Sequence, residues 1–268
     1  MSAAPVDVDL STVGLRFDVD GAVARLTLCR PERRNAQTPS MWLALAAIGA
    51  AVPDDVRVVV VAGEGPSFSA GLDRRMFTPE GVPGEGSLDE VFAGDDGRVA
   101  SVIASYQAGF SWLRDPRFVS VAAVRGHAVG AGFQLALACD LRVVADDAQF
   151  TMAEPTLGLV PDLGGTQPLV ELIGYPRALE ICATGRRFSA AEAERTGLAN
   201  LVVPGDQLET ATDDLVAALL STNRDAVAGT KRLLIDARSR SYDEQLQAER
   251  EIQVGRLRAL RAAAAAAL

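Results

Sequence analysis

The sequence predicts an α/β fold, because apolar strand-like runs alternate with stretches of helical spacing along roughly its first 205 residues. Two further observations support this. With 268 residues, of which 49% are hydrophobic, the chain is long enough to bury a full core. From about Leu208 onward the pattern changes to amphipathic helical runs that end in an Ala-rich tail. We therefore expect an α/β core over residues 1–205 and a helical region over residues 206–268.

The first part of the chain is expected to open with a hairpin, because the dipeptide Asp20-Gly21 favours a tight turn between two strand-like runs. A helix and a β-branched, buried strand follow. After a small-residue turn, a stretch rich in Gly, Pro and acidic residues predicts a long, mobile loop over residues 78–97. The predicted elements are strands over 15–20 and 23–28, a helix over 39–52, a strand over 57–62 and a turn over 67–77.

Strands and helices continue to alternate in the second part of the core, as judged from the period of the apolar residues. The predicted elements are a helix over 99–113, a strand over 119–124, a helix over 131–138, a strand over 141–144, helices over 165–173 and 190–196, and a strand over 200–203.

Composition and charge exclude several classes of function. The formal net charge of −9 argues against general affinity for nucleic acid or for an anionic membrane. The first residues, MSAAPVDVDLST, lack a basic region followed by an apolar run, and no uncharged apolar stretch reaches about 18 residues. Cys29, Cys139 and Cys182 lack the close spacing of a zinc site or a redox pair. We therefore expect a cytoplasmic protein that neither spans a membrane nor binds a metal.

The most informative segment is residues 126–140, which read GHAVGAGFQLALACD. Glycine and alanine let a ligand approach the backbone closely, and the first turn of a helix leaves N–H groups without a partner inside the helix. The helix dipole adds partial positive charge at the same end. Because a carbonyl oxygen bound there would be stabilised as negative charge develops on it, the segment predicts an oxyanion site.

Four motifs occur in the order that is typical of one family. They are RPERRNA at 30–36, FSAGLD at 68–73, the segment at 126–140 and GLVPDLGGT at 158–166. Over roughly residues 18–251 the chain thereby resembles the crotonase, or enoyl-CoA hydratase/isomerase, superfamily. The resemblance implies a crotonase-like spiral of ββα units with a helical C-terminal region, assembled as a homotrimer or a dimer of trimers. It also implies an acyl-CoA thioester substrate, with coenzyme A as part of that substrate and no separate cofactor.

The resemblance also implies positions for the substrate. Backbone N–H groups of Leu72 and Ala131 would hold the thioester carbonyl, and losing one such donor typically costs about 3 kcal/mol of transition-state stabilisation. The other substrate-binding positions that it implies are Arg34, Ala36, Ala70, Gly71, Asp73, Arg75, Gly130, Pro155 and Gly158.

The catalytic side chains depart from the hydratase pattern. Family hydratases carry two Glu residues, one in the helix after the glycine motif and one further along, and these positions fall on Gln134 and Glu154. Glutamine has no ionisable proton in the accessible range, so it can orient a water or a carbonyl but cannot act as a general base. The sequence therefore predicts one catalytic carboxylate, Glu154. A solvated loop acid is the alternative interpretation of this residue.

Asp162 offers a second carboxylate. The family's dienoyl-CoA isomerases resemble this arrangement, with acids at the positions of both Glu154 and Asp162. Two carboxylates in one apolar pocket would have pKa values that move apart, which suits a proton relay. Those isomerases also carry an acid at the position of Gln134, however, and Asp162 precedes a predicted helix, where Asp is a good N-cap. Both roles stay open. The single histidine, His127, is interpreted as structural.

Three hypotheses for function follow. The first is an enzyme that stabilises a thioester enolate and moves one proton with Glu154, which fits double-bond isomerisation of an enoyl-CoA in fatty-acid metabolism. The second is an enoyl-CoA hydratase in which Gln134 and Glu154 hold one water, or a dienoyl-CoA isomerase that uses Asp162. The third, from another class, is a non-catalytic acyl-CoA binding protein.

Overall fold

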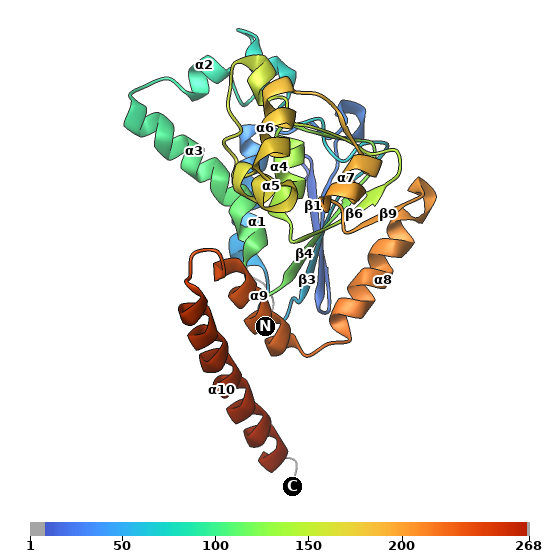
Figure 1. The fold of residues 1–268 in the computed structure, drawn as a ribbon. Coiled ribbons are helices and arrows are strands. Elements are labelled where there is room, and N and C mark those ends of the chain that lie inside the picture. Colours follow the sequence, from blue (N-terminus) through green and yellow to red (C-terminus); the bar gives the residue numbers. More distant parts are fainter. Residues whose placement is uncertain (1–8, 267–268) are drawn as a thin grey trace.

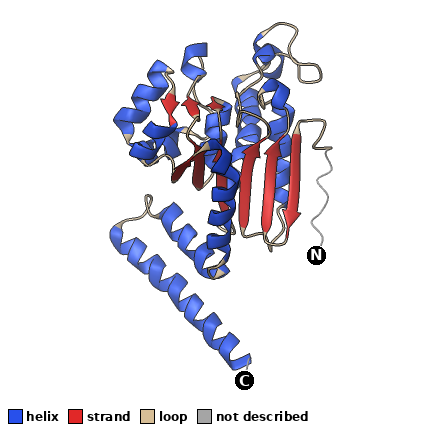
Figure 2. Ribbon diagram, turned by 90° about the vertical axis from the view of Figure 1, so that its right-hand side faces the viewer, coloured by secondary structure: helices blue, strands red, loops and turns tan. Residues whose placement is uncertain are grey.

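The computed structural model describes residues 9–266; the first eight residues, on which the expectation of no secretory leader partly rests, lie outside this range. The described chain contains a six-stranded sheet and a three-stranded sheet, surrounded by helices (Figures 1 and 2). The predicted α/β class is therefore confirmed. In Figure 1 the last two helices, α9 and α10, lie below the body that the sheets and the other helices form.

The larger sheet has the strand order β1-β2-β3-β4-β6-β9. It is parallel apart from the β1–β2 hairpin, whose predicted ends and turn at Asp20 and Gly21 are confirmed. Helices or longer connections separate the parallel strands, as parallel pairing requires. The strands are β1 Leu15–Asp20, β2 Val23–Leu28, β3 Val58–Gly63, β4 Val119–Val124, β6 Leu141–Ala145 and β9 Leu201–Val203.

The two faces of the larger sheet contact different helices, because alternate residues of a strand point to opposite sides. Val58 and Val60 of β3 pack in a cluster with helix α8, Leu208–Leu220. Val59 and Val61 belong to the main core on the other face, together with residues of α1, α3 and α4. The helices on that face are α1 Pro39–Ala51, α3 Asp96–Ser111 and α4 Ala131–Ala138.

The smaller sheet was not predicted. Its strands are only two or three residues long, so they carry no readable period, and tertiary pairing forms them. β5 pairs in parallel with β7, and β7 pairs antiparallel with β8. The strands are β5 His127–Val129, β7 Gln149–Thr151 and β8 Phe188–Ser189. Because β5 precedes α4 and β7 precedes Glu154, this parallel pair brings Glu154 to the N-terminal end of α4.

The stretch expected to be one long loop contains helical structure. A short helix, α2 Leu88–Val91, begins at a capping box in which the Ser87 hydroxyl accepts from the Glu90 N–H and the Glu90 carboxylate accepts from the Ser87 N–H. Helix α3 begins at Asp96, earlier than predicted, because the side chain of Asp95 accepts from the N–H of Arg98. The expected loop therefore ends at Asp95.

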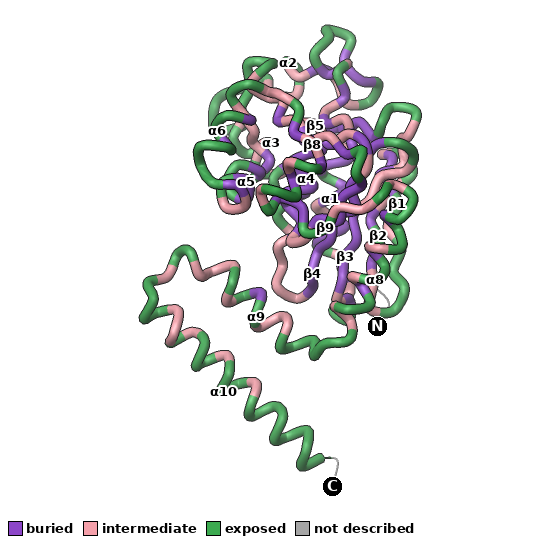
Figure 3. The backbone as a smooth tube through the Cα atoms, turned by 45° about the vertical axis from the view of Figure 1, so that its right-hand side comes forward, coloured by how far each residue is buried: buried purple, intermediate pink, exposed green. Residues whose placement is uncertain are grey.

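The C-terminal helices differ in how they contact the body. α8 packs on the larger sheet, whereas α9, Arg224–Asp236, buries only one residue, Lys231. Helix α10, Tyr242–Ala266, buries none of its described residues, and Figure 3 shows it exposed along most of its length. Whether residues 206–268 form a separate region stays a prediction, since α8 shares a core with the sheet. The remaining helices are α5 Thr166–Ile173, α6 Tyr175–Thr184 and α7 Ala190–Thr196.

Candidate functional site

Two turns that are distant in the sequence meet at the N-terminus of α4. Ser69 and Ala128 form an isolated parallel bridge, in which the Ser69 N–H donates to the His127 carbonyl and the Val129 N–H donates to the Ser69 carbonyl. Gly71, with a φ of +79°, turns the chain directly after this bridge. A Cβ on Gly71 would lie 2.4 Å from the Val129 carbonyl oxygen and 3.4 Å from the Ala131 nitrogen. Only glycine fits this turn, because φ is positive and there is no room for a side chain.

The backbone N–H groups of Leu72 and Ala131 are not used by the hydrogen bonds that hold the described fold together. Within residues 9–266 the Leu72 N–H donates no hydrogen bond, although its neighbours pair with Gln37. Ala131 is the first residue of α4, so its N–H has no partner inside the helix. The two N–H groups that the sequence predicts as donors thus lie on segments that the fold brings together. Such a pair has the chemical capacity to hold a carbonyl oxygen that gains negative charge.

The turn before Leu72 is shaped by a side chain that the sequence reasoning missed. Ser69 is fully buried, and its hydroxyl donates to the Asn35 carbonyl at 2.8 Å. The same oxygen accepts from the side chain of Gln37 at 3.0 Å and from the Gly71 N–H at 3.2 Å. The only sequence signal for this role of Ser69 is a small polar residue directly before the Ala-Gly pair. A buried serine hydroxyl needs hydrogen-bond partners of this kind. Ala70 follows, and its N–H donates to the Arg34 carbonyl.

Gln134 and Glu154 are in direct contact. The Gln134 amide nitrogen donates to Oε1 of Glu154 at 2.7 Å. On its other side, Gln134 Oε1 accepts from the N–H groups of Leu163 at 2.9 Å and Gly165 at 3.2 Å. These two backbone donors need an acceptor, and the carboxylate needs a donor, so the contacts fix which way the amide faces. The Leu163 and Gly165 donors were not predicted.

The carboxylate of Glu154 is largely enclosed. Among the described residues, Oε2 is a buried oxygen that no hydrogen-bond donor reaches. Gly130, with a φ of +50°, lies against the other oxygen, and a Cβ there would be 3.2 Å from Oε1. Burial raises the pKa of Glu154 above its ordinary value, and the negative charge of Asp162 adds to this, while the Gln134 hydrogen bond opposes it. The group is therefore not a solvated loop acid.

Asp162 is half-buried, and burial raises the pKa of its carboxyl as well. The alternative role of Asp162 as a helix N-cap is wrong. Helix α5 begins at Thr166, its N-cap is Gly165, and no side chain caps it. The N–H of Gly165 donates to Gln134 instead. Asp162 thus contributes charge near Glu154 without a capping role.

A cluster of charged residues follows Leu72. Asp73 is buried and binds two cations, with its Oδ2 2.8 Å from Arg75 and 3.3 Å from Arg30. The hydrogen bonds from Arg75 are the main cause that lowers the pKa of Asp73 to about 2, so this carboxylate stays ionised at all ordinary pH values. Arg30 also donates to the carbonyl of Ala36, which is buried. These contacts tie the segment that follows Leu72 to the segment around Ala36.

The other predicted positions lie around these groups. Arg34 is exposed and has a φ of +50°. Pro155 is half-buried in the first turn of the 3₁₀ helix that begins at Glu154, and Gly158 ends that turn in the left-handed conformation. His127 lies in β5, with its Nδ1 3.4 Å from the Ser67 hydroxyl, so it belongs to the strand that supports the site. Residues 9–266 contain no group of His, Cys, Asp and Glu that would hold a metal, and none of their helices is long and apolar enough to cross a membrane.

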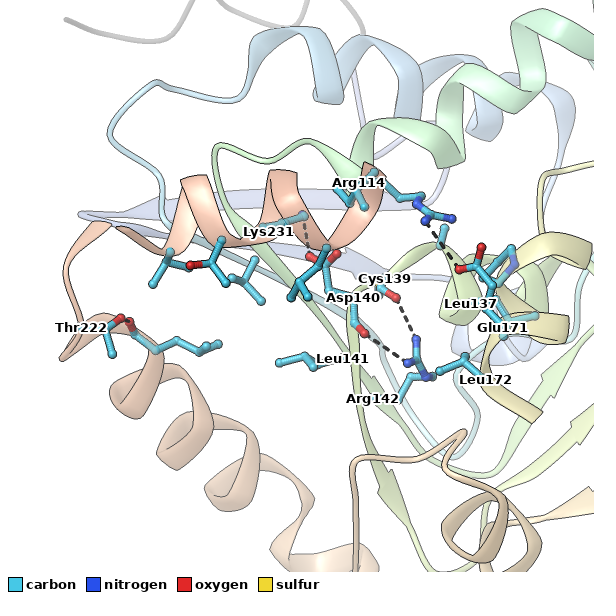
Figure 4. A pocket seen from close by; sticks show the side chains of 18 of the residues that line it. Arg114, Leu137, Cys139, Asp140, Leu141, Arg142, Glu171, Leu172, Thr222 and Lys231 are labelled. Atoms are coloured by element: carbon cyan, nitrogen blue, oxygen red, sulfur yellow. Dashed lines mark hydrogen bonds and ion pairs between the residues drawn. The ribbon is translucent and has the colours of Figure 1, made fainter. Parts of the chain in front are cut away.

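A separate hollow of about 590 Å³ lies at the other end of α4. Figure 4 shows it between the C-terminal end of α4, helix α5 and helix α9. Its charged groups already have partners. Lys231 donates to Asp140 and to two backbone carbonyls, and the buried Arg142 donates to four carbonyls. Gln134 and Glu154 do not line this hollow, so it is distinct from the site described above.

The arrangement of the two turns, helix α4 and the Gln134–Glu154 pair can be compared with known proteins. The model of the family described as enoyl-CoA hydratase/isomerase matches residues 18–259. The chain belongs to the enoyl-CoA hydratase/isomerase family. The resemblance that the four motifs carry is thereby confirmed, and the family explains the order in which they occur.

Relatives within the enoyl-CoA hydratase/isomerase family have more than one activity. The chain is 31% identical over 229 residues to a protein of Mycobacterium tuberculosis named as a probable enoyl-CoA hydratase, covering 85% of this chain and 81% of the relative. It is 29% identical over 235 residues to a peroxisomal Delta(3,5)-Delta(2,4)-dienoyl-CoA isomerase of Arabidopsis thaliana, covering 87% and 84%. Family membership therefore establishes the enzyme class but does not distinguish a hydratase from an isomerase.

Solved structures in the same family match over nearly the whole chain. A Thermobifida fusca YX protein assigned as an enoyl-CoA hydratase, in complex with CoA, has a TM-score of 0.91 and 50% identity, covering 97% of this chain and 99% of that chain. The structure with acetoacetyl-CoA has a TM-score of 0.89 and 52% identity, covering 92% and 96%. This likeness confirms the crotonase-like fold with its helical C-terminal region.

Proposed function

We propose that this enzyme binds an acyl-CoA thioester and moves a double bond along the acyl chain through an enolate. The observation that carries the proposal is the Gln134–Glu154 contact, in which only one partner ionises. The N–H groups of Leu72 and Ala131 would hold the thioester oxygen. Binding of CoA and acetoacetyl-CoA by the Thermobifida relative supports the substrate class. No separate cofactor takes part, since coenzyme A belongs to the substrate.

The reaction needs one base that also serves as the acid. Glu154 removes a proton from C2 of a 3-enoyl thioester, and the electron pair spreads over the thioester oxygen and C4. The two backbone donors stabilise the charge on oxygen. Glu154 then returns the proton to C4, which forms the 2-enoyl product and restores the carboxylate. Arg34, Ala36, Asp73, Arg75, Pro155 and Gly158 would line the path of the substrate.

Hydration is the second candidate, because Gln134 and Glu154 are in direct contact, and the second N–H of Gln134 and Oε2 of Glu154 would both be available to one water. In that case Glu154 would have to remove the proton from water and also supply the proton for C2, since Gln134 cannot ionise. A relay to Asp162, as in a dienoyl-CoA isomerase, is supported by the charge that Asp162 places near Glu154. In a protein that binds acyl-CoA without catalysis, the backbone donors would hold the thioester oxygen and Glu154 would transfer no proton.

These candidates are separated by one comparison of substrates. A 3-enoyl-CoA, a 3,5-dienoyl-CoA and a 2-enoyl-CoA of equal chain length are incubated with the enzyme, and the products are separated by chromatography. We expect the 3-enoyl-CoA to give the 2-enoyl-CoA faster than the 2-enoyl-CoA gives a 3-hydroxyacyl-CoA. Faster hydration would contradict the proposal. Turnover of the 3,5-dienoyl-CoA alone would instead indicate a dienoyl-CoA isomerase with a proton relay from Glu154 to Asp162. Binding of all three thioesters without any product would leave only the non-catalytic function.

We further propose that the chain forms a homotrimer or a dimer of trimers. Large apolar side chains on α10, which buries none of its described residues, support association through this helix. They are Val254, Leu257 and Leu260. Light scattering coupled to size-exclusion chromatography is expected to give three or six times the chain mass. A monomer at micromolar concentration would contradict this.

Replacing Gly71 by alanine should disable the first backbone donor. The added Cβ would lie 2.4 Å from the Val129 carbonyl oxygen at a φ of +79°, so the turn that carries the Leu72 N–H must move. Because loss of one oxyanion donor costs about 10² in rate, we expect kcat to fall roughly 100-fold while the chain stays folded. Gly84→Ala, at a positive φ with no atom within 4 Å of the added Cβ, is the matched control and should keep its activity.

The pH dependence should report the charge of Asp162. Burial raises the pKa of Glu154 and the negative charge of Asp162 raises it further, so the base becomes protonated, and activity declines, at a higher pH than for an ordinary Glu. Asp162→Asn removes that charge and should move the acid limb of the kcat/KM profile to lower pH. An unchanged limb would show that Asp162 does not act on the catalytic base.

A further inference from the structure

Arg142, in β6, is a buried arginine outside the candidate site. It is 2% exposed, and burial lowers the pKa of its guanidinium, although an arginine stays protonated in proteins. Within residues 9–266 no carboxylate forms an ion pair with it, since the nearby Asp140 carboxylate pairs with Lys231. A buried cation without a counter-charge is unfavourable unless other polar groups surround it. What this cation does therefore follows from the carbonyl groups around it.

The partners of Arg142 are backbone carbonyls, and two of them belong to the C-terminal end of α4 (Figure 4). Its guanidinium donates to the carbonyls of Ala136 at 3.3 Å and Cys139 at 2.7 Å, and also to that of Asp140 at 3.1 Å. The last carbonyls of a helix have no partner inside it and carry partial negative charge. Cys139, the C-cap of α4, is extended and lacks the left-handed conformation that commonly closes a helix. Arg142 thus serves the carbonyls that such a cap would serve.

The fourth contact of Arg142 joins α4 to another part of the body. Nε of Arg142 donates at 2.6 Å to the carbonyl of Leu198, which lies between α7 and β9. The backbone of Arg142 is held at the same place, because its N–H donates to Oδ1 of Asn200 at 2.9 Å. One residue therefore ties the C-terminal end of α4 to β6 and to the segment that precedes β9.

Helix α4 itself is short and tightly enclosed. All eight of its residues are buried, and they span roughly 12 Å along the helix axis. Because a short helix in a close-packed core moves as a unit, the position of its C-terminal end also sets the position of its first N–H. That N–H belongs to Ala131, the second donor proposed for the thioester oxygen.

We propose that Arg142 is a positioning residue, which fixes α4 along its axis so that the N–H of Ala131 stays aligned with the thioester oxygen. The inference rests on the proposed function, because it concerns the same oxyanion donor. A displacement of about 1 Å can lower a rate roughly 100-fold, even when the substituted residue lies far from the reacting atoms. The alignment matters most when charge develops on the oxygen, so its loss lowers kcat more than it raises KM.

The chain offers a matched control at helix α8. Arg57 donates to the carbonyls of Leu220 at 2.9 Å and Leu219 at 3.4 Å, at the C-terminal end of α8, and to that of Thr222 just beyond it. The contacts are of the same kind, but α8 covers the other face of the larger sheet and carries no proposed donor. Arg57→Met therefore reports the structural cost of losing an arginine at the end of a helix.

Kinetics of four enzymes test the inference: the wild type, Arg142→Lys, Arg142→Met and Arg57→Met. The kcat and KM for isomerisation of a 3-enoyl-CoA are measured, with kcat expressed per site that binds acyl-CoA, so that unfolded protein is not counted. We expect kcat to fall about 10- to 100-fold in Arg142→Met while KM changes little. Arg142→Lys, which keeps the charge on a single nitrogen, should recover part of the loss. Arg57→Met should lose thermal stability and keep the wild-type kcat.

Infrared difference spectroscopy of a bound acyl-CoA with an isotope-labelled thioester carbonyl reports the alignment without any turnover. Hydrogen bonds from the two N–H groups should lower the frequency of the carbonyl stretch in the wild type and in Arg57→Met. The shift should be smaller in Arg142→Met and intermediate in Arg142→Lys. A role in folding alone would leave the stretch of the bound thioester unchanged in every variant that folds.

Several outcomes would overturn the inference. One is a folded Arg142→Met enzyme with the wild-type kcat, and another is an equal loss of kcat in Arg57→Met. A lower kcat with an unchanged carbonyl stretch would also overturn it, because the effect would not pass through the thioester oxygen. If neither Arg142 variant folds, the residue supports the fold as a whole, and its specific role toward Ala131 is wrong.

The failure of this inference can be told apart from the failure of the proposed function. Full isomerisation by the wild type, with an unchanged carbonyl stretch in Arg142→Met, would overturn the positioning role only. A wild type that forms no isomer, but whose carbonyl shift is lost in Arg142→Met, would contradict isomerisation and leave the positioning role standing. A wild type without any carbonyl shift would contradict the two oxyanion donors and the inference with them.

Discussion

Replacing Glu154 by glutamine is expected to reduce isomerisation of a 3-enoyl-CoA by about 10³- to 10⁴-fold, because in the proposed mechanism this residue supplies both proton transfers, and general acid–base catalysis contributes up to about 10⁴. The loss should appear in kcat, measured by separation of the two enoyl-CoA isomers. Binding of acyl-CoA should persist, since the backbone donors of Leu72 and Ala131 are unaffected by this change.

The stability of the same variant distinguishes a catalytic loss from unfolding. Since burial raises the pKa of Glu154 in the folded state, its contribution to stability is present at low pH and is lost as pH rises through that raised pKa. At neutral pH, Glu154→Gln should therefore be as stable as the wild type or more stable. Glu180→Gln, at an exposed ion pair with Arg186, is the control that should keep full activity. Retention of most activity in Glu154→Gln would remove Glu154 from the mechanism.

Replacing Gln134 by glutamate is expected to raise the hydration of a 2-enoyl-CoA by about 10³-fold, within the range that a general acid or base contributes. The new carboxylate can accept from the N–H groups of Leu163 and Gly165 as the amide oxygen does, so the local fold should persist. Its other oxygen would lie near Oε1 of Glu154, which the amide nitrogen contacts at 2.7 Å. Two carboxylates at that distance share a proton, which gives the acid and base that hydration needs.

The gain is measured as loss of the conjugated double bond of crotonyl-CoA, with the product identified as 3-hydroxybutyryl-CoA. Gln107→Glu adds the same charge nearby and should leave hydration at the wild-type rate. A folded Gln134→Glu enzyme that hydrates no faster than the wild type would show that the amide does not limit hydration.

Much of the fold was readable because strong local signals agree with the tertiary structure. The Asp20-Gly21 turn fixes the β1–β2 hairpin, and β4 and α4 have the predicted bounds, since their apolar runs are long and clearly bounded. Helix α6, Tyr175–Thr184, was missed, although Pro176 in its first turn is a typical start signal. The strands of the smaller sheet are too short to be read locally, because their pairing depends on segments distant in the sequence.

The candidate site also has a part that the sequence predicts and a part that depends on tertiary contacts. The motifs and the family resemblance identified Leu72, Ala131, Gln134 and Glu154, and the fold brings the two motif segments and the two side chains together. The orientation of the Gln134 amide could not be predicted, because it is fixed by N–H groups of Leu163 and Gly165, some 30 residues later. The N-cap interpretation of Asp162 was wrong because the helix starts further along, after Gly165.

In the proposed function, Glu154 removes a proton from C2 of the thioester, and the N–H groups of Leu72 and Ala131 stabilise the enolate that results. The most direct test of this step is mass spectrometry of a saturated acyl-CoA incubated with the enzyme in deuterated water. We predict that deuterium enters at C2 with the wild type and that Glu154→Gln reduces the exchange rate at least 1000-fold. A wild-type enzyme that binds the thioester and incorporates no deuterium, or equal exchange in Glu154→Gln, would contradict the account.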